Sequence, residues 1–77
     1  MKSYYVDLDT VIDENFKEFK DYLRKNNIHY SIINESGPAG GWPIVRYRSA
    51  SKNSLKQMIN LHWLDEDLFD NIKEEKQ

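Results

Sequence analysis

The sequence predicts a single small α+β domain, and three observations support this. Three short stretches contain apolar residues at alternate positions, which is the period of a half-buried strand. Two longer stretches repeat apolar residues at intervals of three and four, as one face of a helix does. A length of 77 residues allows one domain with one small core. The expected order is β-α-β-β-α, followed by a short C-terminal helix.

The first strand is expected at about residues 3 to 8, where Tyr4, Val6 and Leu8 fall on one face. Asp9 and Thr10 then break the alternation. A helix is expected from there to about Lys25, capped by the Asp9-Thr10 pair or by Asp13. Its apolar stripe comprises Ile12, Phe16, Phe19 and Leu23.

Two further strands form a predicted hairpin. The first covers residues 28 to 33 and places Ile28, Tyr30 and Ile32 on one face. The turn runs from residue 34 to 42 and contains Gly37, Gly40 and Gly41, which accept positive φ angles at low cost. Asn26-Asn27, before the hairpin, suits the end of the preceding helix. After Pro43, the alternation in residues 44 to 48 predicts the third strand.

The second helix is expected to begin after Ser51, whose hydroxyl suits a helix N-cap. Its apolar face is formed by Leu55, Met58, Ile59 and His62. A last turn or short helix from Asp65 would present Leu68, Phe69 and Ile72. Residues 73 to 77 are expected to be a charged, frayed tail.

The simplest sheet for these elements has three strands in the order 1-3-2, with both helices on one face. This is a ferredoxin-like split β-α-β arrangement without its fourth strand. The outer side of the first strand would then be an open edge. Such an edge is a route to a homodimer or to capture of an extended partner, unless the helices or the tail cover it.

Composition excludes several classes of protein. No cysteine is present, which excludes disulfides, thiolate metal sites and a cysteine nucleophile. No apolar run has the length of a membrane span or a signal peptide, so we expect a cytoplasmic protein. From Asp65 onward there are six acidic residues and two lysines, whereas the preceding residues contain nine basic and seven acidic ones. This balance does not favour general polyanion binding.

The predicted open face of the sheet leaves two interpretations. It would carry Tyr5, Asp7, His29, Ser31, Ile33, Ile44, Arg46 and Arg48. Aromatic and arginine side chains on an open sheet bind single-stranded RNA in several protein modules. Alternatively, Asp7 pairs with Arg46 or Arg48 across neighbouring strands, and the face is a solvated, charge-balanced surface.

The sequence contains no recognisable catalytic or metal-binding constellation. His29 and His62 are the only histidines and lie in different predicted elements, so a zinc site is not expected. No serine lies in a nucleophile motif. The glycine-rich turn lacks the spacing of a phosphate-binding loop and leads into a strand. We therefore expect no enzyme, no cofactor and no metal.

A binding module is the function that these residues favour. Exposed tryptophan, tyrosine and arginine are the residue types of interaction hot spots. The expected partner-binding residues lie in the glycine-rich turn and on the open face of the sheet: Trp42, Gly40, Gly41, Tyr5, Arg46 and Arg48. The alternative is an RNA-binding or single-strand-binding protein that uses the open face, and a third hypothesis is a structural homodimer.

One combination of motifs resembles a known group of proteins. The turn Gly37-Pro38-Ala39-Gly40-Gly41-Trp42-Pro43 is followed by Ile44 and Val45 and then by a serine-capped helix with Leu55, Met58, Ile59 and Trp63. Over residues 28 to 64 this resembles small accessory proteins of T4-like tailed bacteriophages. The resemblance implies a host-takeover or counter-defence factor that binds and modulates a bacterial host protein or nucleoprotein without catalysis. It supplies no site residues, and the acidic tail is too short for a DNA mimic.

Overall fold

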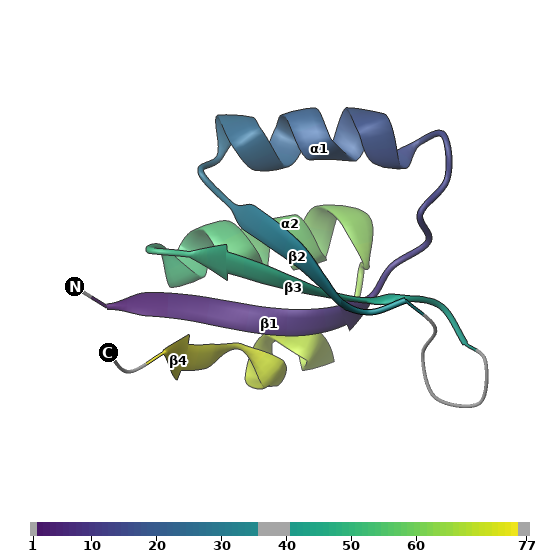
Figure 1. Ribbon diagram of the computed structural model, residues 1–77. Helices are drawn as coiled ribbons and strands as arrows, with labels where there is room; N and C mark the ends of the chain where they lie inside the picture. Colours follow the sequence, from purple (N-terminus) through teal and green to yellow (C-terminus); the bar gives the residue numbers. More distant parts are fainter. Residues whose placement is uncertain (1, 36–40, 76–77) are drawn as a thin grey trace.

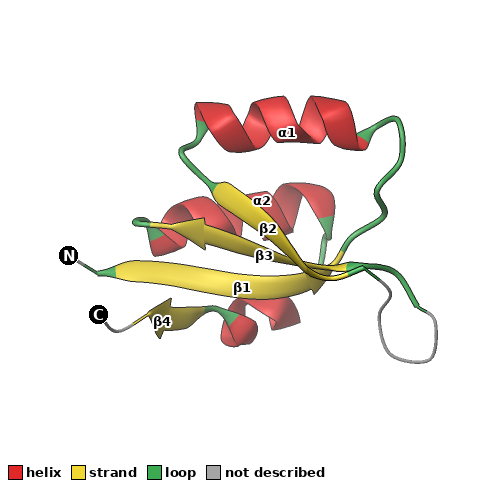
Figure 2. Ribbon diagram, viewed as in Figure 1, coloured by secondary structure: helices red, strands yellow, loops and turns green. Residues whose placement is uncertain are grey.

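The computed structural model describes residues 2–35 and 41–75. It is an α+β fold in which an antiparallel sheet carries two α-helices and a short 3-10 helix (Figures 1 and 2). The elements in chain order are β1 (Ser3–Asp9), α1 (Phe16–Lys25), β2 (His29–Asn34), β3 (Ile44–Ser49), α2 (Lys52–His62), the 3-10 helix η2 (Glu66–Asn71) and β4 (Lys73–Glu75). The expected α+β class is therefore confirmed.

The sheet has four strands in the order β2-β3-β1-β4, not three. The expected order 1-3-2 is present within it, since β3 pairs with both β1 and β2. Strand β4 is added on the outer side of β1. Residues 3–5 of β1 pair with Lys73–Glu75, so the edge expected to be open is covered there by residues expected to fray. The buried side chain of Ile72 anchors the chain directly before β4 and returns it to β1.

Both α-helices pack on one face of the sheet, as expected. Val6 and Leu8 of β1 and Val45 and Tyr47 of β3 point into the same core. The helices add Leu23, Leu55, Met58 and Ile59, and Ile28 and Ile72 complete the core. Along β2 the coverage is poorer, and Tyr30 and Ile32 remain 40% and 46% exposed although their cross-strand partners are buried. The helix layer therefore covers the centre of the sheet better than its β2 edge.

Helix α1 begins later than the apolar stripe predicts. It starts at Phe16, and Ile12 lies in the preceding connection with its side chain exposed. The N–H group of Thr10 donates to the carbonyl of Pro43 at 2.9 Å, and its hydroxyl donates to the carbonyl of Leu8 at 3.1 Å. These bonds hold the chain beside the start of β3 after β1 ends. The N-cap of the helix is Asn15, which makes no side-chain cap hydrogen bond, so the cap expected from Asp9-Thr10 or Asp13 is wrong.

The other predicted helix boundaries agree with the structure. Ser51 caps α2, since its Oγ accepts the N–H of Ser54 at 3.3 Å. Asn27 follows α1 with φ = 56°, which asparagine tolerates well. The expected short helix after Asp65 is η2. Among residues 2–35 and 41–75, neither α-helix combines the length and the hydropathy that crossing a membrane requires.

Candidate binding groove

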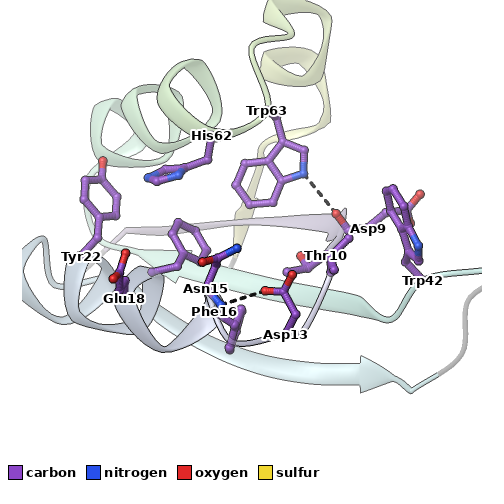
Figure 3. A pocket seen from close by; sticks show the side chains of 12 residues that line it. Asp9, Thr10, Asp13, Asn15, Phe16, Glu18, Tyr22, Trp42, His62 and Trp63 are labelled. Carbon is purple, nitrogen blue, oxygen red and sulfur yellow. Dashed lines mark hydrogen bonds between the residues drawn. The ribbon is translucent and has the colours of Figure 1, made fainter.

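An open groove lies between α1, the C-terminal end of α2 and the end of β1 (Figure 3). Its volume is about 600 Å³, within the range of roughly 300 to 1,000 Å³ of sites that hold small organic groups. Six aromatic rings line it: Phe16, Phe19, Tyr22, Trp42, His62 and Trp63. Three acidic residues line it as well: Asp9, Asp13 and Glu18. We call this site the aromatic groove.

The wall of the aromatic groove is built around Phe19. Its ring centroid lies 4.5 Å from that of His62 and 5.7 Å from that of Trp63, in edge-to-face arrangements. Tyr22 stacks on Phe19 from the next turn of α1, with centroids 6.0 Å apart. Such contacts add stability beyond simple burial. They join the two helices and give the groove a preformed wall.

Two hydrogen-bonded groups hold the floor of the groove in place. The indole N–H of Trp63 donates to the main-chain carbonyl of Asp9 at 3.1 Å. Thr10 lies 2.8 Å from the hydroxyl of Tyr47, a residue with no exposed surface. The single proton of Thr10 is donated to Leu8, so Tyr47 donates to Thr10. Burial raises the pKa of Tyr47 to about 12, which keeps its phenol neutral.

Two ionisable groups in the wall are affected by burial. Burial lowers the pKa of His62, because the surrounding rings replace the water that would stabilise its charged form. Burial raises the pKa of Tyr22. The hydroxyl of Tyr22 is inaccessible to solvent and has no hydrogen-bond partner among the described residues. The wall is therefore neutral near pH 7.

The carboxylates give the aromatic groove its charge. Asp13 accepts the N–H of Asn15 at 2.9 Å through Oδ1. Within residues 2–35 and 41–75 no lysine or arginine lines the groove, and Asp9, Asp13 and Glu18 form no ion pair. In Figure 3, Glu18 and Asp13 come from the α1 side, facing His62 and Trp63 on the α2 side. The aromatic groove is thus acidic.

The structure separates the predicted partner-binding residues. Trp42 is 63% exposed and lines the aromatic groove at the end opposite Tyr22 (Figure 3). Gly41 is exposed beside it, whereas Gly40 and residues 36–39 of the turn lie outside the described residues. The remaining three predicted residues, Tyr5, Arg46 and Arg48, do not line the groove. They lie on the helix-free face of the sheet. The predicted partner-binding residues therefore belong to two separate surfaces.

The open face is charge-balanced where its arginines lie. Arg46 donates to both carboxylate oxygens of Asp7, at 2.7 and 3.0 Å, and its guanidinium lies 4.5 Å from the ring centroid of Tyr5. This hydrogen bonding raises the pKa of Arg46. Arg48 Nε lies 3.3 Å from a carboxylate oxygen of Glu75. This contact is an ion pair without a hydrogen bond, because Arg48 Nε has no hydrogen-bond partner among the described residues. The ion pair expected for Asp7 is confirmed.

Sequence reasoning missed most of the aromatic groove. The sequence predicts Phe19 and His62 on apolar helix faces and assigns Trp63 to no site. It predicts Asp9 and Asp13 as helix caps and assigns no role to Glu18. A usable signal was present, because the faces predicted for the two helices both carry aromatic rings near one end of the sheet.

The fold and the groove define a small α+β domain with one preformed, acidic and aromatic surface hollow. No family model matches the chain, and neither the curated proteins nor the solved structures contain a match. The function is therefore inferred from the geometry of the chain itself.

Proposed function

We propose that this protein is a non-catalytic binding module that receives a segment of another protein in the aromatic groove. The observation that carries the proposal is the exposure of Trp42 at the mouth of a preformed aromatic hollow. Tryptophan is among the residues that contribute most to protein interfaces. Because Phe19, His62 and Trp63 already contact one another, the wall that they form needs little ordering on binding.

The resemblance to accessory proteins of T4-like bacteriophages suggests where to find the partner. On this proposal the partner is a bacterial host protein or nucleoprotein, bound in the host cytoplasm and modulated by occupation of its surface. The order β-α-β-β-α-β and the sheet order β2-β3-β1-β4 support assigning the domain to the ferredoxin-like arrangement. That arrangement hosts many functions, so it does not identify the partner.

Binding of RNA or single-stranded nucleic acid through the open face is the alternative. The pairing of Arg46 with Asp7 and of Arg48 with Glu75 weighs against it, because paired arginines release fewer counterions from a phosphate backbone. A homodimer through the outer side of β1 would have to form beyond Tyr5 or displace β4. We therefore place the partner segment in the groove.

The test is a pull-down from bacterial lysate with tagged protein, with and without nuclease. A protein that survives nuclease treatment and is lost with Trp42→Ala supports the proposal. Leu61→Ala is the matched control, since Leu61 is 55% exposed and does not line the groove. Capture that is lost on nuclease treatment, or with Arg46→Ala rather than Trp42→Ala, would favour the open face.

A further inference from the structure

We propose that the aromatic groove recognises an arginine side chain of the bound protein segment. This inference rests on the proposed function and specifies the chemistry of the ligand. It follows from three features of the groove that act together: its acidic residues, the exposed ring of Trp42, and the absence of lysine and arginine from its lining within the described part of the chain.

The charge of the groove selects a cation. Asp9, Asp13 and Glu18 line it, no lysine or arginine among the described residues does, and partial burial lowers the pKa of the wall histidine, His62. The carboxylates make no ion pair within residues 2–35 and 41–75. A cation that enters the groove therefore need not displace an existing partner. An acidic segment would be repelled.

The rings select a cation that can also stack. Trp42 makes no ring contact with the described residues, and it lines the groove together with Asp9. Tryptophan has the strongest attraction for a cation held over its face. A guanidinium can stack on the indole of Trp42 and donate hydrogen bonds to carboxylates at its edge. A lysine ammonium can do only part of this, since it is compact and strongly hydrated.

The same domain contains an internal example of this contact. On the open face, the guanidinium of Arg46 lies over the ring of Tyr5 and donates to Asp7. The aromatic groove brings aromatic rings and acidic residues together again, and among residues 2–35 and 41–75 no arginine lines it. Lys20 lies 5.9 Å from the ring centroid of Phe16, which lines the groove, but Lys20 itself is not among the described residues that line it.

Capped tripeptides test the inference by NMR titration of the full chain. The peptides are Gly-Arg-Gly, Gly-Lys-Gly, Gly-Glu-Gly and Gly-citrulline-Gly, in which citrulline is the uncharged counterpart of arginine. We expect the arginine peptide to shift the indole signals of Trp42 and Trp63 with a dissociation constant on the order of 1 mM. The citrulline peptide should bind about tenfold more weakly.

Charge-neutral variants locate the binding. Asp9→Asn and Glu18→Gln should each weaken the arginine peptide several-fold, whereas Glu14→Gln should not, because Glu14 lies in the same segment as Asp13 but does not line the groove. Asp13→Asn removes a third charge from the groove. It keeps an oxygen that can accept the N–H of Asn15 and so preserves the local turn. All these positions are exposed, so folding should be retained.

Each outcome separates this inference from the proposed function. Preference for arginine that is lost with the groove variants supports the inference. Equal binding of arginine and citrulline, equal binding of arginine and lysine, or no shift of groove signals with any peptide would overturn it. In those cases the loss of the captured protein with Trp42→Ala would still support a protein-binding groove, whereas retention of that protein would remove the proposed function as well.

Discussion

The indole N–H of Trp63 donates to the main-chain carbonyl of Asp9 at 3.1 Å, which joins the end of α2 to the end of β1. Replacement of Trp63 by phenylalanine would keep a ring against Phe19 and remove the donor. We expect a loss of about 1 kcal/mol in the free energy of unfolding, typical of one hydrogen bond. Urea denaturation measures this, and an unchanged midpoint would show that the bond contributes no net stability.

The pair formed by Thr10 and Tyr47 predicts an asymmetric response to mutation. Tyr47→Phe leaves the hydroxyl of Thr10 still donating to Leu8, so the cost should be about 1 kcal/mol. Thr10→Val leaves the buried hydroxyl of Tyr47 without its acceptor, and the cost should be roughly 1 to 3 kcal/mol. Chemical denaturation of both variants tests the order. A larger loss for Tyr47→Phe would mean that Tyr47 is not the donor.

Tyr22 offers the opposite case. Its hydroxyl is inaccessible and has no partner among the described residues, whereas that of Tyr47 is paired. Tyr22→Phe should therefore raise the free energy of unfolding by about 1 kcal/mol, because an unsatisfied polar group is removed. Thermal unfolding of the two phenylalanine variants side by side gives the comparison. Destabilisation of Tyr22→Phe would indicate a partner for this hydroxyl.

The lowered pKa of His62 predicts that the protein loses stability as the pH falls. Burial lowers its pKa in the folded state, so between the two pKa values the unfolded chain binds more protons than the native one. The contribution of His62 to stability is then fully present above the pKa of the unfolded chain, about 6.5, and it is lost as pH falls toward the pKa of the folded state. His62→Gln should flatten the change in unfolding midpoint between about pH 7.5 and pH 5.

The other histidine provides the control for this measurement. His29 lies exposed on β2, outside the aromatic groove, and His29→Gln removes one histidine without altering the groove wall. We expect the loss of stability in acid to persist in this variant. An equal flattening in both variants would mean that the effect does not arise from the groove.

Strand β4 predicts the oligomeric behaviour of a shortened chain. A stop codon after Ile72 would remove the partner of residues 3–5 and expose their backbone groups. We expect concentration-dependent association relative to the full chain, because an open strand edge pairs readily. Sedimentation velocity measures it. Glu75→Ala is the control, since it removes the contact with Arg48 and leaves the strand in place; association of this variant to the same extent would assign the effect to charge.

Local patterns predicted much of the fold because each depends on only a few neighbouring residues. The cap at Ser51, the end of α1 at Asn27 and the three longer strands all agree with the structure. Strand β4 consists of Lys73, Glu74 and Glu75, three charged residues without an alternating apolar signal. It forms because β1 is available beside it, which is a property of the tertiary structure.

The candidate site was harder to predict for a related reason. Residues of the aromatic groove come from the end of β1, the connection between β1 and α1, and α1 itself. Others come from the segment directly before β3 and from the end of α2. Trp42 alone was selected, because its position in a glycine-rich turn indicated exposure. Phe19 and His62 fitted a core pattern equally well, and only the meeting of α1 with α2 distinguishes a groove wall from a buried stripe.

The pairing of Ser3 with Glu75 also has a consequence for synthesis of the protein. These two residues are 72 positions apart, yet they lie opposite each other in the sheet. During translation the first strand emerges from the ribosome long before its outer neighbour exists. A nascent chain can gather its apolar core from β1, β3 and the helices, but it completes this sheet only after residues 73–75 have been added.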